Sequence, residues 1–110
     1  MPTKNRTFGK ELLVTNSTIY IAPPRFEGSI DSIVVSNALP TTVTFSLEWY
    51  ESSSSTYYKI ANQVKMYPNS ILQLTDGFIL QPGDFIRGLS SVANAITISI
   101  KVKEEFVTAL

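Results

Sequence analysis

The sequence predicts an all-β domain, an antiparallel β-sandwich of seven to eight strands. Hydrophobic and polar residues alternate in several short segments, which is the period of a strand with one buried face. Proline, glycine, asparagine and serine interrupt the chain between these segments. No segment shows the 3.6-residue period of an amphipathic helix, so two packed sheets are needed to bury the apolar faces.

The amino-terminal residues Met1 to Lys10 are polar and show no periodicity, apart from the apolar Phe8. We expect an N-terminal arm here, residues 1–10, that is either frayed or docked on a neighbouring subunit through Phe8. Short β-prone runs follow at Leu12 to Val14 and at Thr18 to Ala22. The second run should end at Pro23-Pro24, because proline cannot donate a hydrogen bond to a sheet ladder.

The middle of the chain contains the clearest strand. Thr42 to Tyr50 alternates strictly between polar and apolar residues, and Thr56 to Val64 returns after the polar loop Ser52 to Ser55. We therefore expect a hairpin. Before it, Ser29 to Asn37 breaks strict alternation, which indicates either a strand covered on both faces or a strand with a bulge.

The last third of the chain is predicted to form a second hairpin. The short strands Ser70 to Leu74 and Phe78 to Leu80 lead to the turn Gln81-Pro82-Gly83-Asp84, in which proline fixes φ and glycine tolerates a positive φ. Phe85 to Leu89 and Ile96 to Glu104 are then expected to fold back on each other. The strand count and the spacing of the turns fit an immunoglobulin-like or a jelly-roll-like arrangement.

A C-terminal tail, residues 105–110, follows the last strand and contains the apolar Phe106, Val107 and Leu110. An apolar terminus packs either on its own domain or on another subunit. These three residues, together with Phe8, are therefore interface candidates.

Length and charge limit the kinds of partner. A chain of 110 residues is about the size of one compact domain, so we expect a single domain, residues 1–110. Nine basic residues balance nine acidic ones, which gives no indication of attraction to nucleic acid or to an anionic membrane. A net charge of zero also weakens repulsion between copies and so permits a homo-oligomer. The first ten residues lack the apolar core of a secretion signal, and we expect synthesis in the cytoplasm.

The chain has no cysteine and no histidine, which removes disulfides, thiolate nucleophiles, imidazole bases and the usual zinc ligands. Most carboxylates fall at predicted turns or on polar strand faces, where they are solvated or bond local backbone. We therefore predict no enzyme, no catalytic residue, no cofactor and no metal site. The alternative of a calcium ion between Asp76 and Asp84 is weak, because calcium needs six to eight oxygens and no ligand-spaced motif supplies them.

Aromatic residues are the remaining candidates for a binding surface. Trp49 and Tyr58 match apolar strand faces and are expected to fill the core and to form cross-strand pairs. Tyr50 and Tyr57 fall on the opposite face, beside the serine loop, and are predicted to be interface residues. Exposed tyrosine and tryptophan rings also stack on sugars, so a carbohydrate-binding module is the alternative function. Burial of all four rings would exclude that alternative.

Two late segments carry a family resemblance. Leu80 to Arg87, with its Gly-Asp turn, and Ser90 to Ile100, with an Ala/Ser/Asn-rich reversal and an alternating strand, resemble the carboxyl-terminal half of small β-sandwich virion proteins of tailed bacteriophages. Ile33 to Asn37 followed by Thr42 to Leu47 resembles their earlier strand pair. The similarity covers roughly Ser29 to Glu104.

The resemblance implies a non-enzymatic structural subunit repeated on a virion, either a decoration or cement protein of the capsid or a component of the neck or tail. Its termini, loops and sheet edges would bind copies of itself and other virion proteins, such as major capsid, neck or tail subunits. It would be made in the host cytoplasm, a reducing compartment that suits a chain without cysteine, and reside in the virion. The sequence leaves open the place within the virion, the oligomeric state and the host.

Overall fold

A computed structural model describes residues 3–74 and 77–107 and contains nine strands in two antiparallel sheets over that range. Sheet A has the order β1-β9-β3-β6, and β7 also pairs with β3. Its strands are β1 (Thr3–Glu11), β3 (Phe26–Asn37), β6 (Ile71–Leu74), β7 (Phe78–Leu80) and β9 (Ile96–Phe106). Sheet B has the order β2-β8-β4-β5. Its strands are β2 (Ser17–Ile21), β4 (Val43–Glu51), β5 (Thr56–Met66) and β8 (Phe85–Ser90).

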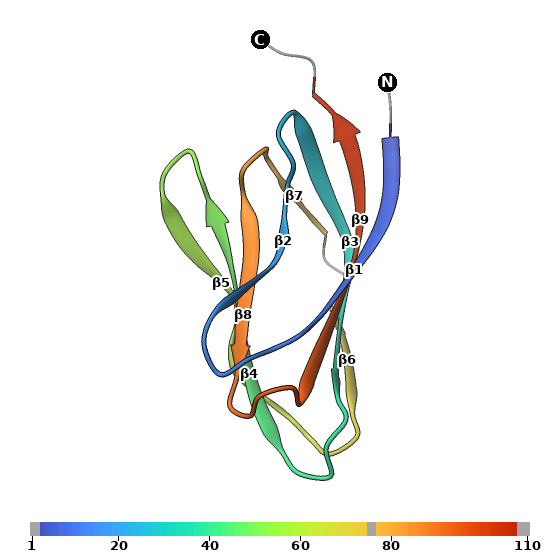
Figure 1. Ribbon diagram of the computed structural model, residues 1–110, viewed down its shortest axis with the longest axis vertical. Helices are drawn as coiled ribbons and strands as arrows, with labels where there is room; N and C mark the ends of the chain where they lie inside the picture. The colour runs from blue at the N-terminus through green and yellow to red at the C-terminus, as the bar shows by residue number, and fades with distance from the viewer. Residues whose placement is uncertain (1–2, 75–76, 108–110) are drawn as a thin grey trace.

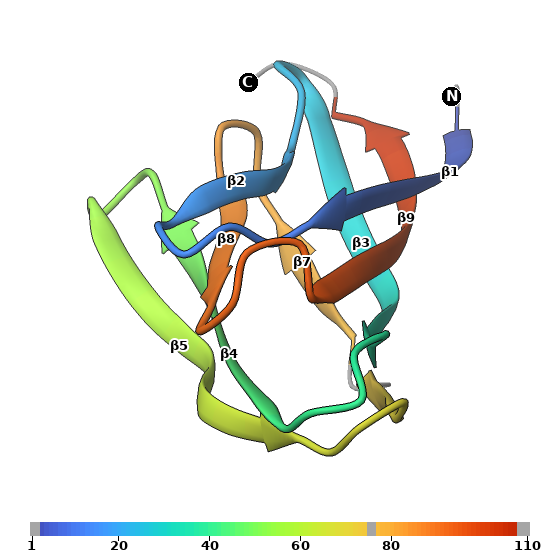
Figure 2. The ribbon, with the colours of Figure 1, turned by 60° about the horizontal axis from the view of Figure 1, so that its bottom comes forward.

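The two sheets face each other and enclose one apolar core, so the prediction of an all-β antiparallel sandwich is confirmed. Figure 2 shows β1, β9 and β3 on one side and β2, β8, β4 and β5 on the other. The alternation read from the sequence sets the inner faces: Ile98 and Ile100 of β9, and Phe45 and Leu47 of β4, are at most 1% exposed. The described residues include no helix long and apolar enough to cross a membrane.

The predicted N-terminal arm is a strand of sheet A instead. β1 pairs with β9 along its whole length, from Thr3 opposite Glu105 to Glu11 opposite Thr97. The strand escapes sequence detection because three of the four side chains in its inner row are charged: the row consists of Lys4, Arg6, Phe8 and Lys10. Sheet A therefore gains one strand, while the run Leu12 to Val14 is a loop that only contributes the buried Leu12 to the core.

The predicted second hairpin is also wrong, because β8 belongs to sheet B and β9 to sheet A. Residues 91–95 carry the chain from one sheet to the other, and the N–H of Ser91 bonds the carbonyl of Thr44 in sheet B. Both strands bury one face, and placing them in opposite sheets turns those faces toward each other. The first hairpin, β4 with β5, is confirmed, and so is a bulge in β3, between Ile30 and Ser32.

The beginning of β1 and the end of β9 lie side by side at the same end of the sandwich (Figure 1). Phe106 of β9 pairs with Phe26 of β3 at this end, and the N–H of Val107 bonds the carbonyl of Arg25. The tail is therefore attached to its own domain through Phe106 and Val107. Leu110 lies outside the described residues.

Candidate functional site

The outer face of sheet B carries three charged side chains in one row across β5, β4 and β8. Glu48 is the ladder partner of both Lys59 and Arg87, and paired residues of neighbouring strands point to the same face. Arg87 Nε donates to Glu48 Oε1 at 2.8 Å, its Nη2 lies 2.7 Å from the same oxygen, and Lys59 Nζ lies 3.0 Å from Oε2. This charged row is held by backbone register as well as by charge.

The Glu48 carboxyl is kept ionised by its neighbours. Its burial favours the neutral acid, because only 12% of the side chain is exposed. Hydrogen bonds from Lys59 and Arg87 outweigh that burial and hold the pKa of Glu48 below its ordinary value. At neutral pH the row is therefore a fixed anion between two cations.

An aromatic row lies next to the charged row, one ladder step along the same face. Tyr50 pairs with both Tyr57 and Phe85, and its ring centroid is 4.7 and 4.9 Å from theirs. The Arg87 guanidinium carbon lies 3.7 Å from the centroid of Tyr57, so it covers one face of that ring and joins the two rows. Tyr57 stays 42% exposed. The role of Tyr50 and Tyr57 at an interface stays a prediction.

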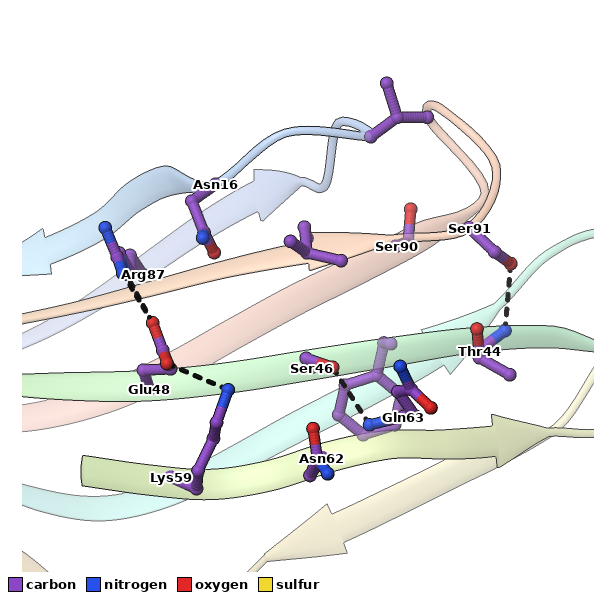
Figure 3. Close-up of a pocket in the computed structure, with 13 residues that line it drawn as sticks. Asn16, Thr44, Ser46, Glu48, Lys59, Asn62, Gln63, Arg87, Ser90 and Ser91 are labelled. Carbon is purple, nitrogen blue, oxygen red and sulfur yellow. Dashed lines mark hydrogen bonds and ion pairs between the residues drawn. The ribbon is translucent and has the colours of Figure 1, made fainter. Parts of the chain in front are cut away.

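A groove of about 470 Å³ lies on the side of the charged row that faces away from the aromatic row (Figure 3). A bulge in β5 shapes it: Phe45 pairs with Val64 but Leu47 pairs with Ala61, so Asn62 and Gln63 both face Ser46. The Ser46 hydroxyl accepts the N–H of Gln63 at 2.9 Å, which holds the bulge in place. The groove is lined by Val14, Asn16, Thr44, Phe45, Ser46, Glu48, Lys59, Asn62, Gln63, Arg87, Leu89, Ser90 and Ser91.

The other aromatic pair, Trp49 and Tyr58, lies on the inner face of the β4–β5 hairpin. The two rings stack at 5.1 Å, and Trp49 packs against the edge of the core. The two residues are ladder partners, so the predicted cross-strand pair is confirmed, but Tyr58 is 44% exposed and its predicted place in the core is wrong. The reason is its position in edge strand β5, near the tip of a hairpin that extends away from sheet A (Figure 2).

A second polar centre lies inside the sandwich, at the opposite end from the groove's bulge. Glu104 of β9 is fully buried, and its carboxylate accepts the Tyr20 hydroxyl at 2.7 Å and Arg6 Nη1 at 3.4 Å. Gly28 makes room for this contact, since a Cβ atom there would lie 2.7 Å from the Tyr20 oxygen. Burial, followed by the hydrogen bond to Glu104 and its charge, raises the pKa of Tyr20 far above its ordinary value.

The remaining interface candidates contact their own domain. The Phe8 ring lies 4.8 Å from that of Tyr20 and packs against the core, and the Arg6 guanidinium carbon lies 4.6 Å from the Phe8 centroid. Phe106 meets Phe26 edge to face at 5.7 Å. Whether Phe8, Phe106 and Val107 also contact other subunits stays a prediction.

The predicted calcium alternative gains no geometric support. Asp76 lies outside the described residues. Asp84 is buried and accepts the N–H of Ser52, the Ser52 hydroxyl and the N–H of Gln81, so its oxygens hold the serine loop against the turn of residues 81–84. Among the described residues, no three histidine, cysteine, aspartate or glutamate side chains come together as a metal site.

Sequence reasoning missed both the charged row and an exposed apolar cluster. The polar position of Glu48 in an alternating strand and the single Arg87 in β8 were the available signals, but their pairing depends on register. The apolar cluster consists of Leu13, Val14 and Val92, each more than 40% exposed. Backbone bonds from Ser90 and Asn94 to the segment 12–13 bring these loops together.

The sequence matches no family model, and no curated protein matches it either. Among solved structures, the chain is similar to a protein of Bacillus endospore appendages, which are described as a novel family of disulfide-linked pili. The TM-score is 0.56 at 13% sequence identity, and the match covers 98% of this chain and 88% of the other. At this identity the likeness shows a shared fold, the two-sheet sandwich.

Proposed function

We propose that this chain is a non-enzymatic structural subunit that assembles with copies of itself. The observation that carries the proposal is the exposure of isoleucine on three edge strands: Ile21 of β2, Ile71 of β6 and Ile79 of β7 are 53%, 74% and 56% exposed. Edge strands of monomers are usually protected by charge, proline or a covering segment, because open edges pair with other chains. Apolar edges combined with zero net charge favour contact between copies.

The similarity to an appendage protein supports this proposal, since pili are polymers of repeated subunits. Those pili are disulfide-linked, whereas this chain has no cysteine. An assembly of this chain would therefore depend on non-covalent contacts alone, at its edges and at the apolar cluster of Leu13, Val14 and Val92.

In its finer form, the proposal is that the assembly belongs to the virion of a tailed bacteriophage, as a capsid decoration, neck or tail component. The resemblance of the segments 80–87 and 90–100 to virion proteins supports it. The partners would then be copies of this chain and major capsid, neck or tail subunits, and the chain would be localised in the virion.

The first test is the mass of the purified chain in solution, measured by light scattering over a range of concentrations. We expect an oligomer whose mass falls in Ile71→Lys or Ile79→Lys but not in the control Tyr67→Lys, which changes an exposed loop residue. A monomer at every concentration would overturn self-assembly. Electron microscopy then separates the two forms: closed rings or particles support a virion component, and an open filament of unlimited length contradicts it.

A further inference from the structure

The groove on the outer face of sheet B is separate from the edge-strand isoleucines of the proposed assembly and shares only Val14 with the apolar cluster. Its volume of about 470 Å³ falls within the range of small-molecule binding sites. Its floor is rigid, because β4 and β8 are central strands of sheet B, each paired on both sides. One bank is the β5 bulge, and the other is the segment that contains Val14 and Asn16.

Three carboxamides project around this groove without an internal partner. Within residues 3–74 and 77–107, the side-chain amides of Asn16, Asn62 and Gln63 form no hydrogen bond. Figure 3 shows Asn16 and Asn62 on opposite banks of the groove, with Glu48 to one side of both, next to Arg87 and Lys59. Each carboxamide offers both a donor and an acceptor. The arrangement therefore suits a ligand whose own groups both donate and accept.

The charged row closes one end of the groove with further hydrogen-bond donors and acceptors. Glu48 is an acceptor of fixed orientation, and Arg87 and Lys59 are donors that keep further N–H groups beyond those used on Glu48. The net charge of the row is one positive charge. A neutral polar ligand can bind there, and one with a single carboxylate is also accommodated.

We propose that this groove binds a short saccharide chain through its hydroxyl groups. Hydroxyls donate and accept, as the lining requires, and neighbouring hydroxyls on a sugar ring match the spacing of amide and carboxylate groups. A peptide ligand would need apolar pockets for its side chains. Because Phe45 is buried, Val14 and Leu89 are the main apolar residues that line the groove. A nucleic acid would need cations along its phosphates. The groove has two cations, Lys59 and Arg87, and the charge of Glu48 neutralises one of them.

Recognition would depend on hydrogen bonds more than on ring stacking. Arg87 already covers one face of Tyr57, which closes that face to a sugar. Trp49 and Tyr58 lie on the inner face of their hairpin, away from the groove. This differs from the sequence-based alternative, in which four aromatic rings form the platform.

The test is to screen the full-length chain against a panel of neutral and acidic oligosaccharides and to titrate the binders by calorimetry. Two variants probe the groove: Asn62→Ala removes one carboxamide, and Glu48→Gln keeps the shape of the side chain but removes its charge. Each should weaken binding about tenfold, the effect of one lost hydrogen bond of about 1.4 kcal/mol. The matched control Gln73→Ala removes an exposed carboxamide on sheet A and should leave affinity within about twofold.

Three results would overturn the proposal. The first is the absence of binding across the whole panel. The second is binding that survives both Asn62→Ala and Glu48→Gln, and the third is binding abolished by Tyr58→Ala alone, which would move the site to the Trp49–Tyr58 pair. None of these results bears on the oligomeric state, so a failure here is distinct from a failure of the proposed assembly.

Discussion

The two polar centres of this sandwich contain the same chemistry in opposite surroundings. Each has a glutamate beside an arginine, but Glu104 lies inside, fully buried, and Glu48 lies on the outer face of sheet B. The inner carboxylate has a long contact to Arg6, 3.4 Å, and a short one to the Tyr20 hydroxyl, 2.7 Å. The outer carboxylate has two cations within 3.0 Å.

The comparison shows how burial assigns different roles to similar groups. A buried carboxylate has no water to replace a lost partner, so its contacts determine the stability of the fold. Glu48 is covered mainly by its two partners, and these are partly exposed, so solvent and a ligand can reach the row and replace a lost contact at lower cost. We therefore expect mutations at Glu104 to affect folding and mutations at Glu48 to affect binding.

The largest effect should come from Glu104→Ala. The change leaves the Tyr20 hydroxyl and one side of Arg6 without their buried acceptor and creates a cavity, and it should lower the free energy of unfolding by about 2–4 kcal/mol. Urea denaturation followed by tryptophan fluorescence measures this. Glu105→Ala, its exposed neighbour in β9, is the control and should change stability by less than about 0.5 kcal/mol. Equal effects of the two changes would contradict the assigned role of Glu104.

An intermediate effect is expected from Tyr20→Phe, which removes only the hydroxyl that donates to Glu104. The loss should be about 1–2 kcal/mol near neutral pH. Because the folded state raises the pKa of Tyr20, its stabilising contribution is complete below the unfolded value of about 10 and is lost as the pH rises above it. Unfolding measured between pH 8 and pH 11 should therefore show a steeper loss in the wild type than in Tyr20→Phe. Parallel curves would count against a buried, protonated Tyr20.

The smallest effect on stability is expected from Glu48→Gln, at less than about 1 kcal/mol, because Lys59 and Arg87 are partly exposed. The pKa of Glu48 is lowered by folding, so its contribution is present above the unfolded value of about 4.3 and is lost as the pH falls through the folded value. The difference between wild type and variant should therefore vanish in acid and shrink in high salt. A difference that grew below pH 4 would show that the charged row does not stabilise the fold.

The sequence was sufficient to predict those strands whose buried face is apolar over most of its length, although β9 also buries Glu104. β4 and β9 are the examples, because strict alternation of apolar and polar residues allows no other arrangement of their faces. Residues 3–10 show no strand pattern because Lys4 and Arg6 occupy the inner row of β1, where they contact Phe26 and Phe8 at the rim of the core. Alternation is uninformative when the buried face of an edge strand is partly charged.

Pairing was harder to predict than strands. The residues of β8 and β9 do not indicate that they enter different sheets, because each strand buries one face and a short segment connects them. The candidate site was missed for the same reason: Glu48 meets Arg87 only through the pairing of β4 with β8, and the irregularities in β5 bring Asn62 and Gln63 opposite Ser46. A site made by cross-strand neighbours is defined by register, which lies beyond the reach of local patterns.

The antiparallel pairing of β1 with β9 places both ends of the described chain at one end of the molecule. A tensile force applied between those ends would pull β1 away from β9 starting at Thr3, so the hydrogen bonds between the two strands would break one pair after another and not all together. Such a domain resists end-to-end pulling weakly. In any assembly, mechanical load should therefore be transmitted through contacts between sheet edges and not through the two ends of the described chain.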